Sequence, residues 1–194
     1  MGGDEWSTMA EDSLVAQARV GSRDAMVELY HRHRGLVIGY VLKMTGDRDL
    51  ADEIFAATFA AFFENLHRYR SRGSLAAYLL RIARSRIADE ARARGRLGRT
   101  PPPSSTGDPG RFDSIDPSPG PADSIATSEL VGRAEEALLK LSEPLREVVV
   151  LRLYEGLDYA AIAAIVGAGE ATVRSRMRYA LQTLRQRLNA PSDS

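Results

Sequence analysis

The sequence predicts an all-α protein of two small helical domains, a helical bundle followed by a C-terminal helix-turn-helix domain. Apolar residues recur at helical spacing through both halves of the chain. A proline-rich segment between the halves cannot form a packed helix or sheet core. The 194 residues are 44% hydrophobic, which supports a real core. The expected divisions are a tail at 1–11, the bundle at 12–96, a flexible acidic linker at 97–127, the helix-turn-helix domain at 128–188 and a tail at 189–194.

The bundle is predicted to contain four helices separated by glycine-containing or polar breaks. The first carries Leu14, Val15 and Ala18 before a break at Gly21-Ser22, and the second carries an apolar face from Met26 to Met44 before a turn at Gly46-Asp47. The third is expected from Asp49 to Leu66 and the fourth from Leu75 to about Arg94. Asp12 or Ser13 is expected to cap the first helix, because short polar side chains accept hydrogen bonds from the free backbone N–H groups there. Gly95 and Gly98 are expected to end the fourth. The phenylalanine stripe of the third helix is most simply core.

Charge is unevenly distributed along the chain, although the formal net charge is zero. Arginines gather in two helical stretches, from Arg81 to Arg99 and from Glu170 onward, and acids predominate between Pro101 and Leu130. Arginine outnumbers lysine 24 to 2, and its planar guanidinium suits forked contacts to phosphate and guanine. The pattern argues against a uniformly basic nucleic-acid coat.

The end of the chain shows a helix, a three-residue turn and a longer helix, which is the helix-turn-helix spacing. Asp158 is expected to cap the first helix, and Gly167 opens the turn. The closing helix, from Glu170 to Leu188, has an apolar face opposite a polar one. That polar face carries donors for phosphates and base edges. A merely solvated amphipathic helix remains the alternative on this pattern alone.

Two sets of landmarks run through the predicted domains. The C-terminal set is Leu141, Pro144, Arg146, Glu155-Gly156-Leu157, Tyr159, Ile162-Ala163, Gly167, Thr172-Val173, Ser175-Arg176 and Leu184. The N-terminal set is Glu28-Leu29-Tyr30, Ala51-Asp52-Glu53-Ile54, Phe59, Arg70, Gly73-Ser74, Leu79-Leu80-Arg81-Ile82-Ala83-Arg84 and Asp89. In this order they resemble the promoter-melting and the C-terminal domains of extracytoplasmic-function (ECF) sigma factors of bacterial RNA polymerase. The resemblance covers nearly everything except the linker and the tails.

The resemblance implies a transcription initiation factor that binds core RNA polymerase and promoter DNA and is not an enzyme. The polymerase's largest subunit would bind a helix face formed by Asp49, Asp52, Glu53, Ala56 and Ala57. The −10 element would be held by Tyr69, Arg81, Arg84 and Ser85, with an unstacked base captured near Tyr69. The −35 element would be read by Thr172, Arg174, Ser175, Arg178, Tyr179 and Gln182. The acidic linker would pass through the polymerase's nucleic-acid channels, and an anti-sigma factor would be a further partner.

Some positions depart from the family pattern. Family members usually carry Gln-Glu where this chain has Ala56-Ala57. The loss of these polar side chains would weaken polymerase binding or make it conditional. Tyr179 stands where a basic residue is usual, so the recognition helix has fewer phosphate contacts than is typical. One hypothesis is that phosphorylation of Thr58 adds negative charge and restores polymerase affinity. The alternative is that Thr58 is a half-buried helix residue.

No cofactor or metal is expected. The chain has no cysteine, which excludes disulfides and thiolate metal sites and fits a reducing cytoplasm. His31 and His33, two apart on a helix, point in different directions, so a solvated surface is expected there. The apolar runs are far too short to cross a bilayer, so we expect a cytoplasmic protein without membrane insertion.

Two other functions remain open. A sigma-like regulator or adaptor would bind polymerase or an antagonist without productive initiation. Ala56-Ala57 supports this alternative, because the alanines lack the polar contacts expected for polymerase binding. It would need a modification or a partner for stable polymerase binding. An ordinary helix-turn-helix repressor would need no polymerase, and the promoter-melting resemblance of the bundle disfavours it.

Overall fold

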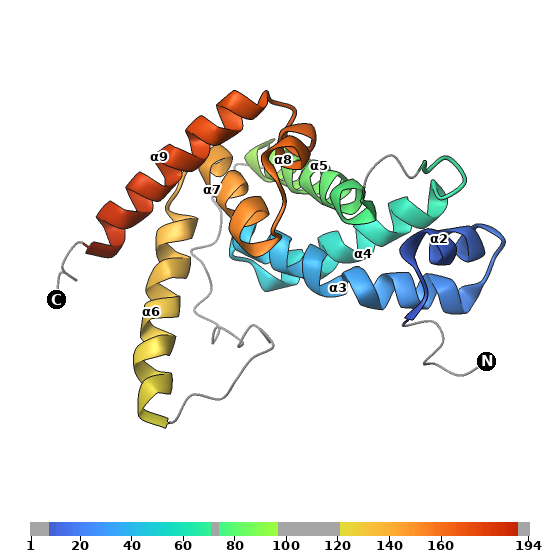
Figure 1. Cartoon of the computed structure of the whole chain (residues 1–194), viewed down its shortest axis with the longest axis horizontal. Helices are drawn as coiled ribbons and strands as arrows, with labels where there is room; N and C mark the ends of the chain where they lie inside the picture. The colour runs from blue at the N-terminus through green and yellow to red at the C-terminus, as the bar shows by residue number, and fades with distance from the viewer. Residues whose placement is uncertain (1–7, 71–73, 97–120, 190–194) are drawn as a thin grey trace.

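The computed structural model describes residues 8–70, 74–96 and 121–189, and all regular elements in these ranges are helical. The N-terminal module consists of α2 (Glu11–Arg19), α3 (Arg23–Thr45), α4 (Arg48–Glu64) and α5 (Leu75–Arg96). The C-terminal module consists of α6 (Pro121–Leu139), α7 (Glu143–Val149), the π-helical turn η1 (Val150–Tyr154), α8 (Tyr159–Val166) and α9 (Glu170–Asn189). Figure 1 shows the two modules side by side. The predicted all-α class is confirmed.

Local chemistry defines several helix ends. The side chains of Ser22, Asp47 and Asp158 each accept a hydrogen bond from a backbone N–H three residues further along, at 3.3, 3.0 and 2.7 Å respectively. Gly46 and Gly167 end α3 and α8 with φ of 71° and 68°, a left-handed conformation that glycine adopts without a side-chain clash. The predicted cap at Asp158 is therefore present.

Three boundaries differ from the sequence-based expectation. The N-cap of α2 is Ala10, which makes no side-chain cap, so neither Asp12 nor Ser13 plays the expected part. Helix α5 continues through Gly95 to Arg96, because one glycine costs only about 1 kcal/mol inside a helix. Gly98, the other glycine expected to end it, lies outside the described residues. Helix α6 begins inside the predicted linker, whose remaining residues, 97–120, lie outside the described part of the chain.

The core of the N-terminal module is aromatic, as the phenylalanine stripe predicts. The Phe59 ring lies at the centre of this cluster, 5.2 Å from Tyr30, 5.0 Å from Phe55 and 6.3 Å from Phe62 between ring centroids. These rings join α3 to α4, and offset or edge-on packing of this kind adds to the energy of burial. Helices α2 and α5 close the bundle on either side.

The C-terminal module packs α9 across α6, α7 and α8. Helix α7 passes into η1, where the Glu155 N–H donates to the Val150 carbonyl at 3.2 Å. This wider turn carries the chain to α8 and was not anticipated from the sequence. Short π-helical turns are rare and occur frequently at functional sites.

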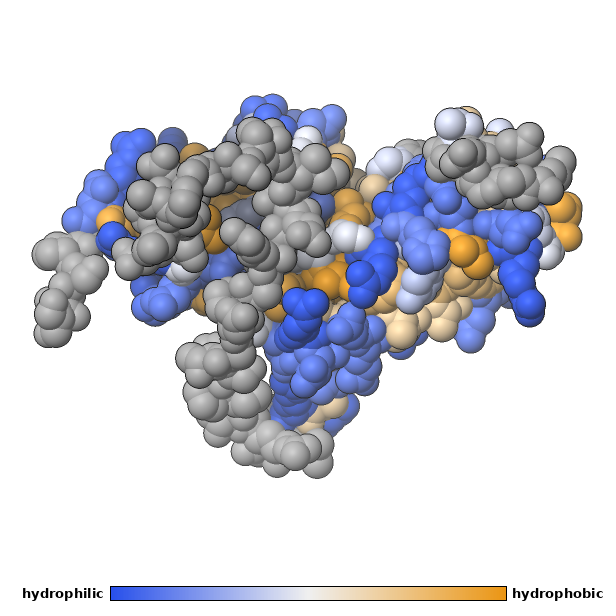
Figure 2. Space-filling view, turned by 90° about the horizontal axis from the view of Figure 1, so that it is seen from below, coloured by the Kyte–Doolittle hydropathy of each residue, from blue (hydrophilic) through white to orange (hydrophobic). Residues whose placement is uncertain are grey.

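The two modules share one buried core. Helix α5 contacts α8, and α3 contacts α6, α7 and η1 (Figure 1). On the face seen from below, apolar side chains lie in small groups among hydrophilic ones (Figure 2), which is ordinary for a protein surface. In the described ranges, no helix has the length and apolarity needed to cross a lipid bilayer.

Candidate nucleic-acid and partner interfaces

Helix α9 separates an apolar from a polar face. Val173, Met177 and Ala180 are buried against the rest of the module. Five of the residues expected to read DNA are exposed on the other side and the sixth, Ser175, is half-buried; the five are Thr172, Arg174, Arg178, Tyr179 and Gln182. A hollow of about 550 Å³ runs along this face beside Tyr159. The helix therefore presents guanidinium and amide donors around an open groove.

Tyr159, the first residue of α8, positions one of these arginines. The guanidinium carbon of Arg174 lies 4.4 Å from the centre of the Tyr159 ring, and that of Arg152 lies 5.1 Å from it. Arg152 also donates to the Leu157 carbonyl at 2.8 Å, which fixes the loop before α8. Cation–π contacts of this kind limit the positions available to Arg174. The sequence pattern marked Tyr159 only as a family landmark. The contact between the Tyr159 ring of α8 and Arg174 of α9 joins two helices, so the periodicity of neither helix predicts it.

Helix α5 presents part of the expected −10 site. Arg81 and Ser85 are exposed and line a hollow of about 430 Å³ together with Tyr78. The guanidinium carbon of Arg81 lies 5.7 Å from the centre of the Tyr78 ring. The hollow thus combines an aromatic ring, a cation and a hydroxyl, which suit an unstacked base and its phosphate.

Tyr69 does not occupy the place expected for it. Its side chain is only 5% exposed, and its ring packs 5.9 Å from Phe62 and 4.9 Å from Tyr78. Arg19 donates to the Tyr69 backbone carbonyl from α2. The buried Tyr69 ring therefore packs against the half-buried Tyr78, and Tyr78 is the tyrosine that lines the hollow. Residues 71–73, part of the loop expected to surround the base, lie outside the described chain.

Arg84, the fourth residue of the expected −10 group, lies on the same helix but does not line this hollow. Its Nε donates to Glu147 Oε1 of α7 at 2.7 Å. Glu147 is buried between the modules. In this conformation, the guanidinium that was expected to hold DNA is engaged with the chain's own carboxylate.

The expected polymerase-binding face lies on α4. Asp49, Asp52, Glu53 and Ala56 are exposed there, and Ala57 is half-buried. Asp49 lies in the first turn of the helix, where a carboxylate interacts favourably with the helix dipole. The second half of the face offers only methyl groups. The structure thus brings all five predicted residues onto one side of α4.

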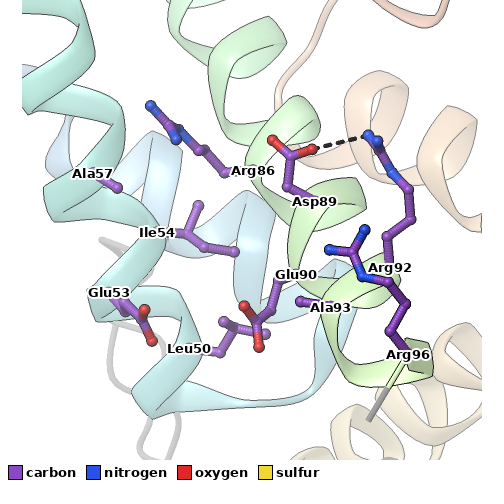
Figure 3. Close-up of a pocket in the computed structure, with 10 residues that line it drawn as sticks. All are labelled: Leu50, Glu53, Ile54, Ala57, Arg86, Asp89, Glu90, Arg92, Ala93 and Arg96. Atoms are coloured by element: carbon purple, nitrogen blue, oxygen red, sulfur yellow. Dashed lines mark ion pairs between the residues drawn. The ribbon is translucent and has the colours of Figure 1, made fainter.

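A hollow of about 420 Å³ lies between α4 and α5 beside this face (Figure 3). Ile54 and Ala57 line it from α4, and Arg86 lines it from α5. Asp89 and Arg92 form an ion pair of 2.9 Å at its edge. The small side chain of Ala57 helps to leave this space open, because a longer residue would extend into it.

Thr58 is fully buried, which argues against the phosphorylation hypothesis. The side chain is 0% exposed, and its hydroxyl has no hydrogen-bond partner in the described chain. A kinase cannot reach this hydroxyl in the folded bundle, and the core has no room for a phosphate. The alternative interpretation, a half-buried helix residue, is closer, but Thr58 is more deeply buried than it supposed.

His33 is buried rather than solvated, contrary to expectation. Its Nε2 lies 2.9 Å from Glu11 Oε2, and burial lowers the pKa of the imidazole although Glu11 opposes this effect. Glu11 Oε1 also accepts from the Leu75 N–H at 3.2 Å, so the pair joins α2, α3 and the start of α5. Among the described residues, no three His, Cys, Asp or Glu side chains gather as a metal site requires.

Comparisons with known proteins agree with this geometry. Residues 29–97 match the family model for Sigma-70 region 2, and residues 132–184 match that for Sigma-70, region 4. The chain is 32% identical over 191 residues to the ECF RNA polymerase sigma factor SigD of Mycobacterium tuberculosis, covering 94% of this chain and 85% of that protein. It is 30% identical over 181 residues to SigK of Mycobacterium sp. strain KMS, covering 90% and 88%.

Two solved structures share the fold. CnrH in complex with the cytosolic domain of CnrY superposes with a TM-score of 0.67 at 22% identity, covering 96% of this chain and all of that one. RpoE in complex with the anti-sigma factor NepR from Bartonella quintana gives 0.61 at 23% identity, covering 81% and 91%. The modules, their order and the sequence identity lead to one conclusion: the chain belongs to the ECF family of RNA polymerase sigma factors, which are promoter-specific transcription initiation factors and not enzymes.

Proposed function

We propose that three faces of this sigma factor divide its work: α9 reads the −35 element, α5 holds the −10 element, and α4 binds core RNA polymerase. The strongest support is the exposed polar face of α9, on which the Arg174 guanidinium packs against the Tyr159 ring. A braced guanidinium suits a forked contact to a guanine edge. The neighbouring Arg178 and Gln182 supply further donors to phosphates and bases.

On α5, the hollow around Tyr78, Arg81 and Ser85 supports binding of the opened strand. An aromatic ring next to a cation can stack on a base and pair with its phosphate, and such contacts offset the cost of unstacking. On α4, the acidic first half supports pairing with basic residues of the polymerase. The alanines of the second half permit a partner helix to approach closely.

Run-off transcription tests this assignment. Purified core polymerase from the source organism is combined with the chain and with DNA from upstream of the chain's own gene. Specific initiation that depends on the chain, and that is lost in Arg174→Ala but retained in Arg133→Ala, supports the assignment. Arg133 is a suitable control because it donates to the Leu188 carbonyl at the far end of α9. Stable polymerase binding without initiation would favour a regulator instead.

An anti-sigma factor is a further proposed partner, since the solved RpoE structure is a complex with the anti-sigma factor NepR. We place the protein in the cytoplasm, where its polymerase acts. Cell fractionation checks the location, and recovery with the membranes would contradict it. Co-expression of the chain with the protein encoded beside it, followed by co-purification, tests the partner.

A further inference from the structure

Glu147 is a buried carboxylate at the junction of the two modules. Its side chain is 3% exposed, although it belongs to α7 and its two partners belong to the other module. The Tyr40 hydroxyl donates to Glu147 Oε1 at 2.9 Å, and Arg84 Nε donates to the same oxygen at 2.7 Å. A buried carboxylate is costly unless it is paired and hydrogen-bonded. The closed arrangement therefore depends on both donors.

Neighbouring contacts close the same junction. Arg146, next to Glu147, donates to the Met44 carbonyl at the end of α3. The Lys43 ammonium lies 4.5 Å from the centre of the Tyr154 ring in η1. All of these contacts join α3 and α5 to the C-terminal module, and all would be lost if the modules separated.

The closed arrangement is incompatible with a bound promoter. Elements centred about 10 and about 35 base pairs upstream lie roughly 85 Å apart along the DNA, at about 3.4 Å per base pair. Helices α5 and α8 are in direct contact here, and packed helices lie only about 10 Å apart. The modules must separate before α5 and α9 can each reach their element.

We propose that Glu147 takes the place of a promoter phosphate in the free chain, holding Arg84 and keeping the modules closed until polymerase binding separates them. One observation and one general principle support this. Arg84 lies on the DNA-facing helix, next to the exposed Ser85, yet it bonds to a carboxylate of the same chain. An ionised carboxylate and a phosphate both accept charge-assisted hydrogen bonds from a guanidinium. The inference rests on the proposed role of α5.

Distance measurement on the full-length chain tests the closure directly. The sequence contains no cysteine, so Val27→Cys on α3 and Asn189→Cys at the end of α9 provide two unique and exposed sites for spin labels. At about pH 6, where closure is expected to be favoured, we expect one narrow distance distribution for the otherwise unchanged chain. Glu147→Gln and Tyr40→Phe should each broaden it toward longer distances, because each weakens the bonds at Oε1 and preserves shape.

The matched control is Glu136→Gln, which removes an exposed carboxylate of α6 that pairs with Lys140 of the same module. It should leave the distance distribution unchanged. If Glu147→Gln also leaves it unchanged while the chain stays folded by circular dichroism, the Glu147 contact does not hold the modules together and the proposal fails. Tyr40→Phe leaves α7 untouched, so a folding defect in the C-terminal module cannot mimic its effect.

Strand binding tests the competition with DNA. The free Glu147→Gln chain should bind a fluorescent single strand carrying the non-template −10 sequence about tenfold more tightly than the unchanged chain, the effect of one charge-assisted hydrogen bond. With core polymerase bound, the two should bind equally. Separation without tighter strand binding would overturn the competition. Failure of the unchanged chain in run-off transcription would count against the proposed function, while the distances would still decide the closure.

Discussion

Tyr159 shows how a single ring can set the direction of a DNA-reading side chain. It holds Arg174 by a cation–π contact of 4.4 Å, and such contacts contribute about 0.5–1 kcal/mol at exposed sites. We predict that Tyr159→Leu weakens binding of the polymerase complex to promoter DNA about two- to fivefold. Tyr159→Phe keeps the ring and should bind normally. Fluorescence anisotropy with labelled promoter DNA measures both.

A double-mutant cycle separates this role from a general effect on folding. Tyr159→Leu and Arg174→Ala should be strongly non-additive, because each removes the same contact. Tyr159→Leu and Arg178→Ala should add, since the Arg178 guanidinium instead lies beside Tyr179, with 5.7 Å from its carbon to the ring centre. Equal coupling in both cycles would show that Tyr159 acts through the fold of α8 alone.

Thr58 gives a second test at the level of one side chain. Its buried hydroxyl lacks a hydrogen-bond partner in the described chain, so Thr58→Val should be neutral or should raise the free energy of unfolding by about 1 kcal/mol. Thr58→Glu should lower it by about 3–5 kcal/mol, because an unpaired charge would enter the core. Urea denaturation measures both. A well-folded Thr58→Glu chain with improved polymerase binding would revive the phosphorylation hypothesis.

Helix α4 carries Ala56-Ala57, where the family resemblance leads one to expect Gln-Glu. Restoring the family pair by Ala56→Gln and Ala57→Glu should tighten core polymerase binding about five- to tenfold, through two added polar contacts. The glutamate would also extend toward the hollow lined by Arg86 (Figure 3). Biolayer interferometry with immobilised core polymerase measures the affinity.

The matched control is Ala164→Gln on the exposed side of α8, which should not change core affinity. If the restored pair also leaves affinity unchanged, the polymerase of the source organism does not use the contacts that the family pair would make. The methyl groups of α4 would then be the complementary surface.

Local signals predicted whole elements better than their junctions. The cap at Asp158 and the stop at Gly46 are local, because the hydrogen bonds and the backbone angle involve neighbouring residues. The π-helical turn after α7 depends on packing against other helices and leaves no periodic signal. The burial of Tyr69 depends likewise on its packing against Phe62 and Tyr78, which no local pattern in the sequence indicates.

The arrangement of the whole molecule was the least accessible to sequence reasoning. Periodicity identified the exposed face of α9, since one helix determines it. Glu147 contacts Arg84, which is 63 positions away in the sequence, and Tyr40, which is 107 positions away. No spacing rule relates residues at such separations. The sequence therefore predicted the two modules separately but not a conformation in which they share one buried core.

The same junction contains a second carboxylate, whose ionisation depends on closure. Burial raises the pKa of Glu155 to about 7, and the nearby Lys43 ammonium of α3 opposes this rise. Burial also lowers the pKa of Lys43 and, with the charge of Glu135, raises that of Tyr154. The junction thus disfavours charge on both sides. When the modules separate, water returns to Glu155 and its pKa falls toward the ordinary value of 4.5.

Opening should therefore depend on pH in one direction. Between pH 4.5 and about 7, the closed form binds a proton at Glu155 that the open form releases. The resulting stability of the closed form is complete below pH 4.5 and is lost as the pH rises through 7. We predict that spin-labelled chains shift toward longer distances from about pH 6 to about pH 8, whereas Glu155→Gln chains stay closed throughout. A pH-dependent shift that persists in Glu155→Gln would assign the titration to another group. The absence of any shift in the unchanged chain would mean that Glu155 is equally protonated in both forms.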